Sequence, residues 1–144
     1  MNFGLLLSAD WCGHCQRFMP VWKEFYNKMK NVDNFLLTNL KDYDIENIQS
    51  GGKKEEAMIQ AYILNETHKD NKMVDGKAIV IPPQVVNVVK DKIKNNKGFP
   101  SIFFINYDGE KVKYNEYSGE RSLEGLMKYV TDFMEPQLVK DVEN

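Results

Sequence analysis

The sequence predicts an α/β fold, and three observations predict it. Phe3–Ser8 and Ser101–Asn106 are continuous apolar runs of strand length, which is typical of strands buried on both faces of a sheet. After the first run, apolar residues recur at spacings of three and four, which predicts a helix with one apolar face. Phe35–Leu40 is a further strand candidate, so the chain opens as strand–helix–strand. The apolar positions of the helix are Phe18, Trp22, Phe25 and Met29.

The middle of the chain is harder to assign. A helix is predicted over about Lys53–Leu64, in a stretch that is polar with scattered apolar positions. Asp75-Gly76 is a hairpin-turn signal between two strand candidates, Lys72–Val74 and Lys77–Ile81. The middle is therefore expected to contain one helix followed by a short hairpin.

The last part of the chain carries clear turn and cap signals. Pro82-Pro83 is expected to open a helix that runs to about Lys94. Asp108-Gly109 predicts a tight turn, after which Lys111–Tyr117 alternates and should pair antiparallel with the preceding strand. Ser122 is the expected N-cap of a final helix. At 144 residues, one domain over residues 1–144 is the economical organisation.

Composition excludes several classes of function. The chain has 19 basic and 21 acidic residues, and the resulting net charge of −2 predicts neither nucleic-acid binding nor attachment to an anionic membrane. No apolar stretch approaches the roughly 18 residues of a membrane span. Met1–Leu7 lacks the basic segment of a signal peptide, so a cytoplasmic location is expected, with an ER-like or virion-associated oxidising setting as the alternative.

Both cysteines of the chain lie in Trp11-Cys12-Gly13-His14-Cys15. Two thiols at this spacing close a ring reversibly, and so short a ring removes little entropy from the unfolded chain. A four-cysteine zinc site is excluded because there is no second Cys-x-x-Cys, and a Cys2His2 site would need both His14 and His68. Redox chemistry without a metal or other cofactor is therefore predicted, and a metal site or inert cysteines are the alternatives.

The position of each thiol predicts its role. Cys12 falls at the expected N-terminus of a helix, where free N–H groups and the helix dipole favour a thiolate, so it is the expected nucleophile. Cys15 lies one turn further on and suits the resolving role. His14, when protonated, would add a positive charge beside Cys12; the alternative is an exposed turn residue without a role.

Four segments match motifs of one fold family. Trp11–Cys15 has the redox-active Trp-Cys-Gly-His-Cys signature, and Pro20 falls where that family kinks its first active-site helix. Gly98–Ser101 is similar to the cis-proline segment, and Tyr117–Arg121 to a Tyr-x-Gly-x-Arg stretch. Together these segments resemble the thioredoxin superfamily and, within it, the protein disulfide isomerases.

The resemblance covers about two-thirds of the chain, Phe3–Asp42 and Asn87–Phe133. It implies a thioredoxin-like three-layer sandwich, with a central mixed sheet and helices on both faces. It also implies a cis Pro100 whose loop faces the first cysteine; a trans proline that begins a strand is the alternative. Arg121 either swings towards the second cysteine or stays a solvated charge at the start of the helix. The residues expected to support the cysteines are Trp11, Gly13, Phe99, Pro100 and Arg121.

Three departures from the family pattern matter. The strand and helix that usually precede the active-site strand are not apparent, which would leave Phe35–Leu40 as a sheet edge. Cys12 and Pro100 are 88 positions apart, about twice the usual family spacing, so an insertion is predicted at about 45–81. Ala78–Ile81 is expected to cover the edge; a dimer contact is the alternative.

The third departure is Leu6, which stands where isomerases carry a buried acid six residues before the first cysteine. Without that acid, proton removal from Cys15 should be slower, and so should resolution of mixed disulfides. The Gly-His pair favours a potential near the isomerase value of about −180 mV over the thioredoxin value of about −270 mV.

The predicted function is a thiol–disulfide oxidoreductase that acts on protein disulfides, with an oxidase or isomerase leaning. A thioredoxin-like disulfide reductase and a non-catalytic redox-sensitive interaction module that uses the insertion are the alternatives. The expected partners are proteins with thiols or disulfides and a redox partner, with the chain acting as a monomer or as a dimer through the sheet edge.

Overall fold

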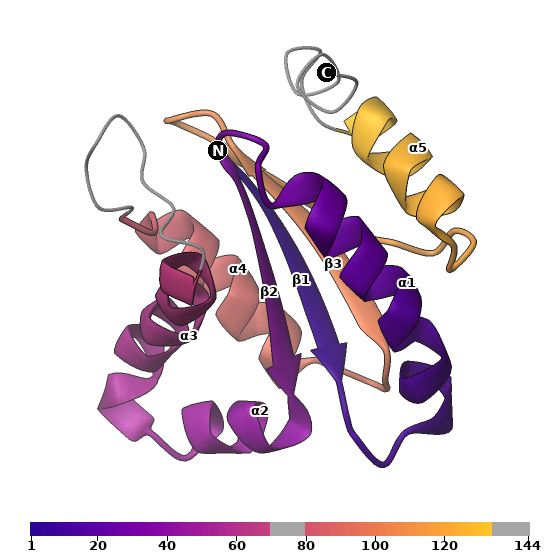
Figure 1. Cartoon of the computed structure of the whole chain (residues 1–144). Coiled ribbons are helices and arrows are strands. Elements are labelled where there is room, and N and C mark those ends of the chain that lie inside the picture. The colour runs from indigo at the N-terminus through magenta and orange to yellow at the C-terminus, as the bar shows by residue number, and fades with distance from the viewer. Residues whose placement is uncertain (70–79, 134–144) are drawn as a thin grey trace.

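The computed structural model of the chain describes residues 1–69 and 80–133, with the backbone alone over 65–69. Within these ranges a mixed sheet has the strand order β2-β1-β3-β4 (Figure 1). β1 pairs parallel with β2 and antiparallel with β3, and β3 pairs antiparallel with β4. The strands are β1 (Asn2–Ser8), β2 (Phe35–Lys41), β3 (Ser101–Tyr107) and β4 (Val112–Glu116).

Helices cover both faces of the sheet. Figure 1 shows α1 and α5 on one face, α3 and α4 on the other, and α2 at the carboxyl end of β2. This arrangement is the predicted three-layer α/β sandwich with a central mixed sheet. The helices are α1 (Gly13–Met29), α2 (Asp42–Gln49), the 3-10 turn η1 (Gly52–Lys54), α3 (Glu55–Lys69), α4 (Pro83–Lys94) and α5 (Leu123–Phe133).

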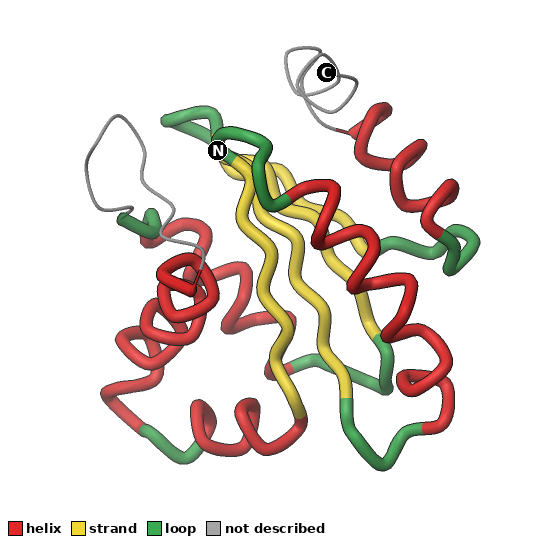
Figure 2. Tube along the Cα trace, viewed as in Figure 1, coloured by secondary structure: helices red, strands yellow, loops and turns green. Residues whose placement is uncertain are grey.

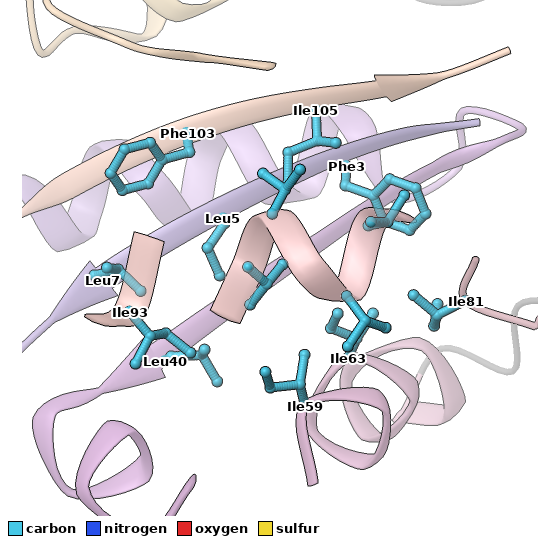
Figure 3. Packing of buried hydrophobic residues seen from close by; sticks show 14 of the residues in the cluster. Phe3, Leu5, Leu7, Leu40, Ile59, Ile63, Ile81, Ile93, Phe103 and Ile105 are labelled. Carbon is cyan, nitrogen blue, oxygen red and sulfur yellow. The ribbon is translucent and has the colours of Figure 1, made fainter. Parts of the chain in front are cut away.

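The alternation of side chains along β1 explains why apolar cores lie on both sides of the sheet. Phe3, Leu5 and Leu7 point into the core under α3 and α4, together with Phe103 and other residues labelled in Figure 3. Leu6 points the other way, into the core under α1 and α5. Every residue of β1 is buried, which confirms the prediction of a central strand.

Local signals start α4 and α5 where the sequence predicted. The side chain of Ser122 caps α5, because its Oγ accepts the Gly125 N–H at 3.0 Å. Pro83 occupies the first turn of α4, where a missing N–H costs nothing. Pro20 lies inside α1.

The edge of the sheet is as predicted, while the middle of the chain differs. β2 ends the sheet order, with β1 as its partner among the described residues. α2 was not predicted, and α3 continues past Leu64 to Lys69. β4 pairs as expected, but four of its five residues are exposed, so the predicted alternation is not seen there.

The predicted hairpin around Asp75-Gly76 lies outside the described residues. Of the Ala78–Ile81 segment, Val80 is exposed and Ile81 is buried in the core with α3 and α4. Of the predicted insertion, about 45–81, the described part forms most of α2 at the carboxyl end of β2, then η1, and then α3 on one face of the sheet.

None of the helices in the described ranges has both the length and the apolar character needed to cross a membrane.

Candidate functional site

The two cysteines lie at the carboxyl end of the central strand β1, where the chain turns into α1. Figure 2 shows this turn and the loop before β3 at the same end of the sheet. Cys12 is the N-cap of α1: its backbone is extended, and its Sγ accepts the Cys15 N–H at 3.3 Å. A sulfur thus occupies the place that a serine or aspartate oxygen usually takes at a helix start.

The environments of the two thiols differ. Both are free, and Cys12 is 7% exposed while Cys15 is 1% exposed. The hydrogen bond from the Cys15 side chain lowers the pKa of Cys12, and the backbone N–H groups of Cys15 and His14 lower it further, against the opposing effect of burial. Burial raises the pKa of Cys15 to about 11. The arrangement therefore favours a thiolate at Cys12 and a protonated thiol at Cys15.

The loop before β3 brings Phe99 and Pro100 to the cysteines. The Phe99–Pro100 bond is cis, as predicted. In its protonated form Cys12 donates a hydrogen bond to the Phe99 carbonyl at 3.6 Å. The Trp11 and Phe99 rings meet edge to face with centroids 6.0 Å apart, and Trp11 is 71% exposed. Residues far apart in the sequence thus surround the Cys12 sulfur.

His14 has a partner that the sequence did not reveal. Arg17 Nη2 lies 2.9 Å from His14 Nδ1. Arginine only donates, so Nδ1 is the acceptor in this contact. Arg17 thus places a positive charge beside the motif, and the role of His14 stays a prediction. The spacing of three residues on α1 was the available signal for this pair.

The end of β2 and the start of α2 supply a second group of polar contacts. Trp11 donates from Nε1 to Asp42 at 2.8 Å, which anchors the exposed indole. Lys41 forms an ion pair with Asp10 at 2.8 Å, and its charge partly offsets the rise in the pKa of Cys15. The Ser8 hydroxyl donates to Asn39 Oδ1 at 2.7 Å. Sequence reasoning missed these contacts.

Arg121 reaches the same loop from the segment before α5. Its Nη2 lies 3.5 Å from the Pro100 carbonyl, and its charge is among the smaller influences that lower the pKa of Cys12. The structure therefore places Arg121 near the Pro100 loop. Its movement towards the second cysteine stays a prediction.

A groove of about 770 Å³ opens beside Cys12. The Trp11–His14 segment forms one wall, and Ile45 and Gln49 of α2 form another. The third wall comes from residues within Ile93–Phe99, at the end of α4 and in the loop before β3. We call this space the Cys12 groove. In the described part of the chain, no three His, Cys, Asp or Glu side chains are grouped so that they could hold a metal ion.

Comparisons with known proteins give one family match. The family model described as Thioredoxin matches residues 5–78, a range that contains both cysteines. No curated protein matches the chain. Among solved structures, the crystal structure of the J-Trx1 fragment of ERdj5 is similar, with a TM-score of 0.45 and 15% sequence identity. That match covers 99% of this chain and 44% of the other, so the chain spans less than half the length of that structure.

Proposed function

This chain belongs to the thioredoxin family, which suggests thiol–disulfide oxidoreductase activity, and we propose that it exchanges disulfides in protein substrates through Cys12 and Cys15. The observation that carries the proposal is the pair of thiols with opposite pKa shifts one helical turn apart. A thiolate at Cys12 is the attacking species, since the thiolate and not the thiol is the nucleophile.

The exchange begins when the Cys12 thiolate attacks one sulfur of a substrate disulfide. A Cys12–substrate disulfide forms, and the other substrate sulfur leaves as a thiolate. If a substrate thiolate then attacks the mixed disulfide, Cys12 is released and the substrate is isomerised without net oxidation. If Cys15 loses its proton and attacks Cys12 instead, the substrate leaves as a dithiol and the chain holds the Cys12–Cys15 disulfide.

The reverse sequence oxidises a substrate dithiol, and the two electrons pass to the Cys12–Cys15 disulfide. Continued turnover in one direction requires a redox partner that is itself a thiol or a disulfide. The Phe99–Pro100 loop is the proposed docking edge for the substrate chain, because the Phe99 carbonyl already faces the Cys12 sulfur.

Two features support an oxidase or isomerase leaning. The lowered pKa of Cys12 stabilises the reduced form, which raises the reduction potential. The raised pKa of Cys15, with Leu6 fully buried in place of an acid, slows the resolving step and gives the mixed disulfide time to rearrange.

Trapping tests the mechanism directly. A Cys15→Ser variant should accumulate substrate on Cys12 as a mixed disulfide that a thiol reductant releases, whereas Cys12→Ser should capture nothing. Wild type should reactivate a scrambled, disulfide-bonded model protein, which is measured as recovered activity of that protein. A reduction potential near about −270 mV would instead support the reductase alternative. Failure of both trapping and turnover would contradict the enzymatic proposal.

A further inference from the structure

We propose that the Cys12 groove selects substrate segments that carry acidic residues close to the reacting cysteine. This inference rests on the proposed function and adds a substrate class to it. The groove is continuous with the site, because Cys12 itself lines it beside Trp11 and Phe99. A polypeptide joined to Cys12 through a disulfide therefore has neighbouring residues within reach of the groove walls.

Apart from the reactive Cys12 sulfur, the charged side chains that line the groove are both lysines. Lys94 and Lys97 are exposed and line the wall formed by the end of α4 and the loop before β3. No aspartate or glutamate is among the lining residues. The groove thus presents two ammonium groups, and a carboxylate is the ligand group that such a surface attracts.

Lys94, at the end of α4, and Lys97, in the loop that follows it, differ from the two earlier lysines of α4. Lys90 and Lys92 each lie near a carboxylate, whereas neither Lys94 nor Lys97 has an ion pair within the described ranges of the chain. The described ion pairs are Lys41–Asp10, Lys90–Glu56 and Lys92–Asp91.

Three acidic residues around the cysteine motif make contacts with other groups. Asp10 is paired with Lys41, and Asp42 accepts the Trp11 indole N–H. Asp44 accepts the backbone N–H of Lys41 at 2.9 Å. Among the described residues no carboxylate forms an ion pair with Lys94 or Lys97, so both ammonium groups are open to a carboxylate of a ligand.

The rest of the lining suits an extended peptide. Trp11 and Phe99 provide apolar surface, and Gln49 and Asn96 provide amides that can meet a peptide backbone. Gln49 also links α2 to α4, because its Nε2 lies 3.5 Å from the Ile93 carbonyl. The volume of about 770 Å³ lies within the usual range for ligand sites, about 300–1,000 Å³.

The test uses short peptides whose single cysteine is joined to a chromophoric aryl thiol, with glutamate, glutamine or lysine on both sides of the cysteine. Reduced protein converts each mixed disulfide into two thiols and itself acquires the Cys12–Cys15 disulfide, so a single turnover needs no other reductant. The second-order rate constant for each peptide is divided by the rate constant for the reaction of dithiothreitol with the same peptide. This correction is needed because flanking charges change the intrinsic reactivity of the peptide disulfide.

The normalised rate is expected to be highest for the glutamate peptide and lowest for the lysine peptide. Two solvent-exposed charge pairs, each of about 0.2–1 kcal/mol, predict a preference of roughly 2- to 30-fold for glutamate over glutamine. The preference should shrink as salt rises from about 0.01 M to about 1 M, where the screening length falls from about 30 Å to about 3 Å.

Charge reversal provides the decisive variant. Lys94→Glu combined with Lys97→Glu should invert the order so that the lysine peptide reacts faster, a gain that misfolding cannot produce. The matched control is Lys53→Glu with Lys54→Glu, two exposed lysines outside the groove, which should keep the wild-type order. Equal normalised rates for all three peptides would overturn the acidic-substrate inference and leave the proposed function standing. No reaction with any peptide would overturn the proposed function itself.

Discussion

At the scale of single residues, one helical turn separates two thiols with opposite properties. Cys12 caps α1 and receives hydrogen bonds at its sulfur, whereas Cys15 is inside the helix and almost fully buried. The N-terminus of a helix is the one place where consecutive N–H groups are free to stabilise an anion. The Cys-x-x-Cys spacing therefore places Cys12 at the helix start and Cys15 one turn further on, as the proposed division of roles requires.

Alkylation should distinguish the two thiols. We expect iodoacetamide to modify Cys12 of the reduced native protein at neutral pH, with a rate that rises through a midpoint below the ordinary thiol pKa of 9.0. Cys15 should react only as the pH approaches about 11, because burial raises its pKa. Peptide mapping by mass spectrometry measures both rates. In urea-unfolded protein the two rates should become similar, and similar rates in the native state would contradict the assignment.

The sequence predicted the cis Phe99–Pro100 bond and its approach to Cys12, but it did not predict the polar residues around them. Lys41 reaches the site because the parallel register places it opposite Ser8, two residues before its partner Asp10. A register set by the packing of β1 against β2 cannot be deduced from the spacing of Lys41 and Asp10 along the chain. The Trp11–Asp42 hydrogen bond depends on the same register.

At the scale of elements, α5 depends on a cap that the sequence already indicated. Ser122→Ala removes the oxygen that accepts the Gly125 N–H and should lower the free energy of unfolding by about 1 kcal/mol. Urea unfolding followed by circular dichroism measures the change. Ser122→Asp should retain most of the stability, because aspartate also caps helices, and Ser118→Ala at an exposed serine should have little effect. An unchanged Ser122→Ala variant would show that the cap does not contribute.

Long apolar patterns were predictable, whereas short elements at the surface were not. α1 and α4 show several buried positions at helical spacing, so their periodicity is visible in the sequence. α2 has eight residues and buries only Ile45 and Ile48, which is too few for a periodic signal. Its start is set by Asp44, which accepts the Lys41 N–H, and its packing comes from β2 and α3. Tertiary contacts, rather than propensity, account for this helix.

At the scale of the whole molecule, the redox state of the cysteines is linked to stability. In the oxidised chain neither sulfur titrates, whereas most other ionisable groups titrate alike in both redox forms. Subtracting the unfolding free energy of the oxidised form from that of the reduced form therefore leaves mainly the contribution of the two thiols. The pKa of Cys12 is lower in the folded reduced protein than in the unfolded chain, so between these values the unfolded state binds more protons. Stability of the reduced form therefore rises with pH over this window.

The opposite holds for Cys15. Its pKa is raised from 9.0 to about 11 on folding, so between these values the folded state binds more protons and the reduced form loses stability as the pH rises. We therefore predict that the unfolding free energy of the reduced protein, minus that of the oxidised protein, increases towards pH 9 and decreases above it.

Urea titrations of both forms at a series of pH values measure this difference. Reduced Cys15→Ser, measured against the same oxidised wild type, should lose the decrease above pH 9 and keep the increase below it. A difference that does not vary with pH would contradict the opposite shifts of the two thiols, and with them the division of roles between Cys12 and Cys15.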